Sequence, residues 1–428
     1  CLEAAEIWDL VSMLEAAGEI RQLLVAAGER FPRLARRARR MGEFSSVTGR
    51  LAGKILPGGM LADDASPELA RLRRELERQR RAIQESLEKF LRRHRQDDLL
   101  QEEFVTIRND RFVVPVIAGR QGRIEGVVHG TSASGHTLFV EPLETIELNN
   151  ELVRLAEEEM REVHRILLEM TAHLRSALPE IQTTLAELGE LEWLFAKARF
   201  ALDFDCAIPV FSPPGERRLA LKSARHPLLE DVLHRQHRKV VPVSLELDDS
   251  CRTLLISGPN TGGKTVTIKT VGLIALMAQS GIPAPAERAE LPLFSKVLAD
   301  IGDNQSIQES LSTFSAHMAR VRDMLEAADS NSLVLLDELG RATDPEEGGA
   351  LGVAVLERFG RAGAFTLAST HLLALKIYGA TTPGVLNASM GFDDRTLEPT
   401  FVLELGRPGK SAGLEIARRL GIPAELIA

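Results

Sequence analysis

Residues 253–257 read Thr-Leu-Leu-Ile-Ser, and the next eight residues read Gly-Pro-Asn-Thr-Gly-Gly-Lys-Thr. The apolar run predicts a buried strand, and the apolar residues that continue to Leu276 predict a helix. A glycine-rich loop between a strand and a helix is the P-loop pattern, in which backbone N–H groups surround a polyphosphate. We therefore expect an ATP site formed by Gly258, Pro259, Asn260, Thr261, Gly262, Gly263, Lys264 and Thr265.

Two side chains at the end of this loop have the chemistry that nucleotide hydrolysis needs. We expect Lys264 to reach the β- and γ-phosphates and the Thr265 hydroxyl to bind Mg²⁺. A second apolar run, residues 333–336, ends in Asp337 and Glu338. Asp337 is placed to hold the same Mg²⁺, and Glu338 is placed to polarise the attacking water.

A third apolar run, residues 364–368, leads into Ser369-Thr370-His371. A neutral histidine at a strand end beside the γ-phosphate can sense it through a hydrogen bond, so we add His371 to the catalytic set. From the break at Pro213-Pro214-Gly215 onward, short β-prone runs alternate with helical stretches. This alternation predicts an α/β domain with a mostly parallel sheet.

The first half of the chain has a different, largely helical pattern. Residues 1 to about 52 read as helices, and Ser66 followed by Pro67 is a good helix start. A narrow apolar stripe then runs to about Arg95, and a second helix of this kind begins near Pro142. The first helix is rich in arginine and the second in glutamate, which favours an antiparallel two-helix arm; two separate solvated helices in a bundle are the alternative.

Residues 104–140, between these helices, are β-prone with turn residues. A small β module at the end of a helical hairpin is suited to contact something distant. The candidate phosphate contacts in it are Arg108, Arg111, Arg120 and Arg123.

Composition excludes several classes of protein. The 428 residues carry 44% hydrophobic and 26% charged residues, an ordinary globular composition, and no run of 18 apolar residues indicates a membrane span. Three cysteines without a Cys-x-x-Cys pair favour a reducing cytoplasm and exclude a zinc finger. A net charge of −9 requires any nucleic acid to bind through local basic patches, and 4% aromatic residues argue against base-stacking platforms.

Four strings in the second half together resemble the MutS family of ATP-binding-cassette ATPases. They are residues 258–265, Ser312-Thr313-Phe314-Ser315, residues 337–344 (Asp-Glu-Leu-Gly-Arg-Ala-Thr-Asp) and residues 369–371. Residues 64–69, 109–116 and 129–135 are similar to the family's second bacterial branch, the anti-recombination and ribosome-rescue type. The resemblance extends over essentially the whole chain.

The resemblance implies a multidomain fold and a homodimer. It implies a helical core and lever at 1–65 and 176–205, a coiled-coil arm at 66–103 and 141–175, a β-rich clamp at 104–140, and an ATPase and dimerisation domain at 206–428. The signature segment, with Ser310, Ser312, Thr313, Phe314 and Ser315, would complete the nucleotide site of the partner.

The departures from the family shape the functional expectation. The mismatch-reading Phe-x-Glu wedge is missing, since Phe139-Val140-Glu141 stands at a strand end, and the nuclease domain of the second branch does not follow residue 428. The chain therefore resembles a fragment truncated at both ends. We expect a cytoplasmic, Mg²⁺-dependent ATPase that binds branched or duplex DNA and suppresses recombination. The alternative partner is the ribosome and its rRNA, with ATP driving the separation of collided ribosomes.

Overall fold

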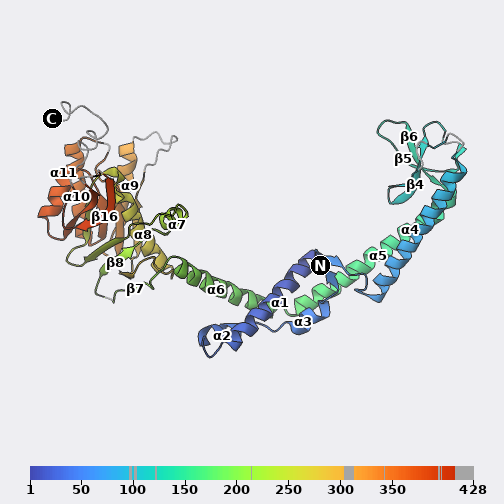
Figure 1. The fold of residues 1–428 in the computed structure, drawn as a ribbon, viewed down its shortest axis with the longest axis horizontal. Coiled ribbons are helices and arrows are strands. Elements are labelled where there is room, and N and C mark those ends of the chain that lie inside the picture. The colour runs from blue at the N-terminus through green and yellow to red at the C-terminus, as the bar shows by residue number, and fades with distance from the viewer. Residues whose placement is uncertain are drawn as a thin grey trace. The chain divides into compact units, whose positions relative to one another are not determined.

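The computed structural model describes residues 1–95, 99–100, 104–120, 123–213, 215–302, 313–341, 343–393, 396 and 398–409. The chain forms two compact units, Cys1–Glu192 and Trp193–Ala428 (Figure 1). The division falls inside the helix α6 (Leu178–Asp203).

The first unit is mainly helical, with a small sheet inserted between its two longest helices (Figure 1). The helices are α1 (Ala4–Ala26), α2 (Pro32–Ala38), α3 (Ser45–Leu51), α4 (Pro67–Arg93) and α5 (Leu143–Ser176), followed by α6. The strands are β1 (Ile55–Leu56), β2 (Met60–Leu61), β3 (Thr106–Arg108), β4 (Arg111–Ile117), β5 (Gly126–Thr131) and β6 (Thr137–Pro142). The helices expected in residues 1–52, from Pro67 and from Pro142 are thereby confirmed.

Helix α4 begins where its sequence predicts. The Ser66 hydroxyl accepts a hydrogen bond from the backbone N–H of Leu69 at 3.0 Å, and Pro67 occupies the first turn, where a missing N–H costs nothing. The apolar stripe is buried against α5; it consists of Leu69, Leu72, Leu76, Ile83, Leu87 and Phe90. Each such side chain contributes about 1.5–3 kcal/mol when fully buried.

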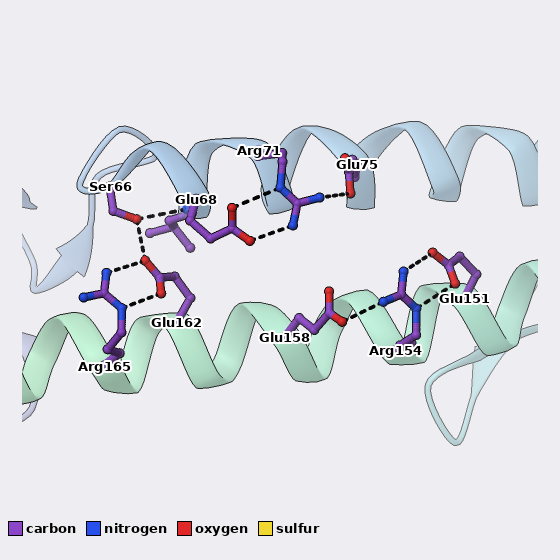
Figure 2. A network of polar contacts seen from close by, with 10 residues as sticks. Ser66, Glu68, Arg71, Glu75, Glu151, Arg154, Glu158, Glu162 and Arg165 are labelled. Atoms are coloured by element: carbon purple, nitrogen blue, oxygen red, sulfur yellow. Dashed lines mark hydrogen bonds and ion pairs between the residues drawn. The ribbon is translucent and has the colours of Figure 1, made fainter.

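Helices α4 and α5 lie side by side and run antiparallel. Contacts between them pair low numbers with high ones: Ser66 with Glu162 at 2.6 Å, Arg73 with Glu159 at 2.8 Å and Arg93 with Glu144 at 3.4 Å. Their ion pairs, however, form mostly within each helix. Figure 2 shows Arg71 between Glu68 and Glu75, and Arg154 between Glu151 and Glu158. The opposite charges of the two helices therefore contribute less to their pairing than the sequence suggested, and the apolar stripe contributes more.

One polar contact between these helices is largely buried. Glu162 accepts hydrogen bonds from Arg165 of its own helix and from the Ser66 hydroxyl (Figure 2). These hydrogen bonds, that from Arg165 first, lower the pKa of Glu162 to about 2. The residue that caps α4 is thus also bound to α5.

The small antiparallel sheet has the strand order β3-β4-β6-β5. Its first hairpin turns through Asn109 and Asp110, both with positive φ (51° and 59°), the conformation of the tight turn that suits two twisted strands. Val114, Val116 and Val140 are fully buried against α4 and α5. The β module expected at residues 104–140 is therefore present and packed on the helical pair.

The second unit is an α/β domain. Its strands are β7 (Val210–Phe211), β8 (Arg218–Ala224), β9 (Val243–Asp248), β10 (Thr253–Ser257), β11 (Arg288–Leu291), β12 (Lys296–Asp300), β13 (Ser332–Leu336), β14 (Phe365–Ser369), β15 (Val385–Asp393) and β16 (Glu398–Leu405). Its helices are α7 (Pro227–Arg235), α8 (Lys264–Gln279), α9 (Thr313–Ala327), α10 (Pro345–Ala362) and α11 (Leu373–Thr381).

Six strands form the main sheet, in the order β12-β13-β14-β10-β15-β16, and all neighbours are parallel except β15 and β16. Alternate residues of its strands enter different cores. Leu254 and Ile256 pack with α8 and with the second sheet, β7-β11-β8-β9, whereas Leu255 packs with α9, α10 and α11. A parallel sheet covered on both faces binds ligands at the carboxyl ends of its strands.

Within the described residues, no helix is long and apolar enough to cross a membrane.

Candidate nucleotide-binding site

The glycine-rich loop joins β10 to α8 at the carboxyl edge of the main sheet. Gly258 (φ 131°) and Gly263 (φ 95°) adopt backbone conformations that side chains disfavour, and residues 260–262 form one turn of 3-10 helix between them. Met390 of β15 lies beneath the loop, 3.0 Å from where a Cβ on Gly262 would stand. The loop therefore has little room for side chains, and its backbone turns around the start of α8.

Lys264 is buried at the first position of α8, with 3% of its surface exposed. Its ammonium donates hydrogen bonds to the carbonyl oxygens of Gly258 (2.7 Å) and Pro259 (3.0 Å), within its own loop. Burial lowers the pKa of Lys264, while the carboxylates of Glu338 and Asp337 act in the opposite direction. A phosphate group at this loop would give the ammonium a charged partner in place of two neutral carbonyls.

The two expected Mg²⁺ ligands are in direct contact. The Thr265 hydroxyl donates a hydrogen bond to Asp337 Oδ2 at 2.7 Å, although 72 residues separate them. Adjacent oxygen ligands of an octahedral Mg²⁺, each about 2.1 Å from the ion, stand about 3 Å apart. The spacing of this pair therefore fits one magnesium ion. Among the described residues, no group of three or more His, Cys, Asp or Glu side chains is arranged to hold a metal.

Ser369, the last residue of β14, organises the acidic pair. It is fully buried, and its hydroxyl donates to Asp337 Oδ1 at 2.5 Å and accepts from the backbone N–H of Glu338 at 2.8 Å. Glu338 has φ of +52°, an unusual conformation for a residue with a side chain. Its carboxylate lies 2.5 Å from Arg341 Nη1. Ser369 thus fixes both the Asp337 carboxylate and the turn that carries Glu338.

The structure brings Lys264, Thr265, Asp337 and Glu338 together at one edge of the sheet. His371 follows β14 at the same edge and is exposed. Sequence reasoning did not single out Ser369, although it stands in the string that drew attention to His371. The signal that could have found it is register: Ser369 pairs with Ile256 of β10, immediately before the loop.

A second buried polar group lies at the end of β12. Asp300 is 5% exposed; its carboxylate contacts the imidazole of His317 and forms an ion pair with Arg320 at 2.7 Å, and both residues lie on α9. Burial opposes the charge of Asp300, but hydrogen bonding by His317 and the charge of Arg320 outweigh it and keep the pKa of this carboxyl below its usual value. The backbone oxygen of Asp300 also accepts the N–H of Asp337 at 2.9 Å. Helix α9 is therefore tied to the strand end beside the acidic pair.

The signature segment lies only partly within the described residues. Ser310 and Ser312 fall outside them, Thr313 and Phe314 form the first turn of α9, and Ser315 is exposed.

The four arginines predicted as phosphate contacts differ in their surroundings. Arg111 is bound to Glu141 of β6 at 2.8 Å and to Asn150 of helix α5 at 2.6 Å. Arg108 is exposed and lies over the Phe139 ring at 4.3 Å. Arg120 and Arg123 are also exposed. Glu141, which is 1% exposed, also pairs with His129 at 2.6 Å, so Arg111 serves the packing of the module.

The family description MutS domain V matches residues 254–428, which begin at β10 and include the loop and the acidic pair. Proteins named Endonuclease MutS2 are similar over the whole chain: 44% identical over 427 residues in Pelotomaculum thermopropionicum, 43% over 440 in Thermomicrobium roseum and 41% over 430 in a Geobacillus strain. The chain belongs to the MutS2 family.

The alignments cover 100% of this chain but only 53–54% of those three relatives. The chain thus spans about half the length of the curated MutS2 proteins it matches and corresponds to their MutS-like part. The similarity to MutS domain V accounts for the nucleotide-site motifs, and the match to MutS2 proteins extends over the helical unit as well.

Proposed function

We propose that this chain is a Mg²⁺-dependent ATPase whose nucleotide state controls its grip on nucleic acid. The observation that carries the proposal is the contact between Thr265 and Asp337, fixed by Ser369 at the mouth of a glycine-rich loop. Hydroxyl, carboxylate and buried ammonium are the groups that phosphoryl transfer requires, and the second half of the chain matches MutS domain V.

Each residue has a distinct part in this proposal. The backbone N–H groups of residues 258–265 bind the phosphates, and Lys264 moves from its loop carbonyls to the β- and γ-phosphate oxygens. Thr265 and Asp337 hold Mg²⁺, which neutralises phosphate charge when bound. Glu338 orients the attacking water and accepts its proton, and its bond to Arg341 must loosen for this. His371 senses the γ-phosphate from the adjacent strand end.

We propose further that two copies act together. The segment from Ser310 to Ser315 completes the site of the partner subunit, so that ATP bridges the two copies and hydrolysis releases them. The β module and its exposed Arg108, Arg120 and Arg123 then contact phosphates of DNA. Branched recombination intermediates are the preferred substrate, and the proposed outcome is suppression of recombination in the cytoplasm.

Competition between substrates tests this proposal. Binding of the chain to a four-way DNA junction, a linear duplex and isolated ribosomes is measured at fixed salt, with and without Mg²⁺-ATP. Preference for the junction that depends on nucleotide supports the DNA proposal. Tight, ATP-dependent binding to ribosomes, together with equal binding to the junction and the linear duplex, would indicate that the ribosome and not DNA is the physiological partner.

A further inference from the structure

The most basic segment of the first unit lies far along the sequence from the β module. Residues 28–41, which include α2 and which we call the elbow, carry six arginines and one acidic residue, Glu29. The arginines are Arg30, Arg33, Arg36, Arg37, Arg39 and Arg40. In a chain with net charge −9, this concentration of positive charge requires an explanation.

Two of the six arginines have a structural role. Arg37 bonds Glu187 at 3.0 Å and Glu190 at 3.1 Å, and Arg40 bonds Glu187 at 2.8 Å. Glu187, on α6, is 4% exposed, so these bonds satisfy a buried carboxylate. Arg37 and Arg40 therefore fasten the elbow to α6.

The elbow is also held by apolar packing and backbone contacts. Ala38 and Met41 are buried with Ala17 of α1 and Leu191 of α6. The N–H of Gly42 donates to the Thr184 hydroxyl at 2.9 Å. The surface that the elbow presents is therefore fixed before any partner arrives, which reduces the entropy lost on binding.

The other four arginines have no such role. Arg30, Arg33, Arg36 and Arg39 are exposed, and none forms an ion pair with a carboxylate within the described part of the chain. The guanidinium of Arg30 lies 5.2 Å from the ring of Phe31, which is itself 44% exposed. Four exposed guanidinium groups in one short segment, without a carboxylate partner, raise the local positive potential and attract an anionic partner.

We propose that the elbow is a second nucleic-acid binding surface, which takes the phosphodiester backbone independently of the β module. Guanidinium groups form paired hydrogen bonds with phosphate oxygens, and an exposed phenyl ring adds contact with a sugar or base. This inference rests on the proposed function in one respect, namely that the chain binds nucleic acid. It adds that residues 28–41 carry part of that contact without reading sequence.

Salt dependence tests the inference, because each phosphate contact contributes about −0.9 to the slope of log Kobs against log salt on duplex DNA. We would replace Arg30, Arg33, Arg36 and Arg39 together by Gln and measure binding to duplex DNA and duplex RNA between about 50 and 200 mM salt. The slope is expected to become shallower by about 3–4 on duplex DNA. A shallower salt slope on either polymer supports the inference, and the polymer on which it is seen shows whether the elbow binds DNA or RNA.

The matched control removes four charges from helix α4. Arg74, Arg78, Arg80 and Lys89 are exposed and likewise form no ion pair with a carboxylate in the described ranges, so their Gln variant should leave the slope unchanged. If the salt slope of this control variant became shallower by the same amount, nucleic acid would be attracted by the overall charge of the unit and not by the elbow, and the inference would be wrong. Unaltered melting temperatures show that both variants fold.

Three further outcomes contradict the inference. If the wild-type chain binds nucleic acid and the elbow variant has the same salt slope, the elbow is not a binding surface, and the proposed function is unaffected. If the wild-type chain does not bind nucleic acid, both the elbow proposal and the proposed function are wrong. Binding of anionic phosphatidylserine vesicles that the elbow variant loses, while its nucleic-acid slope is unchanged, assigns the surface to lipid instead.

Discussion

Removing the hydroxyl of Ser369 is the perturbation that the site geometry predicts most sharply. In Ser369→Ala, Asp337 loses a charge-assisted hydrogen bond of 2.5 Å, and the N–H of Glu338 loses its acceptor at 2.8 Å. The first loss is worth about 1.5–3 kcal/mol and the second about 1–3 kcal/mol when the group stays dry. Because the two bonds share one hydroxyl and their losses are not additive, we expect the free energy of unfolding to fall by about 2–3 kcal/mol.

The effect on catalysis should exceed the effect on nucleotide affinity. Neither bond touches the loop that binds the phosphates, whereas both position the acidic pair. If about 2 kcal/mol of this positioning is lost in the transition state, steady-state ATP hydrolysis falls about 30-fold, while the dissociation constant of ATP without Mg²⁺ changes less than about threefold. A coupled phosphate-release assay and fluorescent-nucleotide titration measure the two quantities.

The same fold provides a control with the same chemistry. Ser332, fully buried at the start of β13, donates to Asp329 Oδ1 at 2.9 Å and accepts the N–H of Asp329 at 3.0 Å, at the opposite end of the sheet. Ser332→Ala should cost comparable stability and leave hydrolysis unchanged. Equal hydrolysis by Ser369→Ala and wild type, or an equal loss in Ser332→Ala, would refute the positioning role of Ser369.

Three other outcomes follow from the structure. Lys264→Ala should weaken ATP binding at least about 30-fold, because a charged phosphate partner is lost; unchanged affinity in titration would remove the loop assignment. Gly340→Ala should lower the free energy of unfolding, measured by urea denaturation, by about 2–4 kcal/mol, because φ is +83° and the added Cβ would stand 2.5 Å from a backbone oxygen of α10. In the control Gly406→Ala, φ is also positive (+84°) but the added Cβ meets open space, so the cost should be about 1 kcal/mol. Hydrogen bonding by Arg165 lowers the pKa of the Glu162 carboxyl to about 2, so the stability that this carboxylate contributes is present above about pH 4.5 and is lost as the pH falls from 4.5 to 2. After solvent screening, Glu162→Gln should lower the free energy of unfolding by about 1–2 kcal/mol at pH 7 and have almost no effect near pH 2.

The sequence predicted those parts of the fold that local chemistry dictates. The cap at Ser66 and the three buried strand runs that end at the site were read correctly because helix capping and hydrophobic runs are local signals. Contacts that depend on the order and register of strands could not be predicted from the sequence. Ser369 acquires its partners from the order of strands, and Arg111 acquires Glu141 from the pairing of β4 with β6.

Charge patterns were the least informative signal. Helices α4 and α5 do pair, but their opposite charges contribute little to it. Residues three and four apart on one helix lie closer than residues across the pair, so most ion pairs form within each helix. The elbow was overlooked for a related reason. Only the structure separates Arg37, bound to buried Glu187, from Arg33 and Arg36, which point to solvent.

We propose that residues at the carboxyl edge of the main sheet bind and hydrolyse ATP. The most direct test compares the wild-type chain with Glu338→Gln, in which the carboxylate becomes an amide of the same size. We expect both proteins to bind Mg²⁺-ATP with dissociation constants within about threefold of each other, and the variant to hydrolyse it at least about 100-fold more slowly. Hydrolysis by Glu338→Gln at the wild-type rate, or failure of the wild-type chain to bind Mg²⁺-ATP, would contradict it.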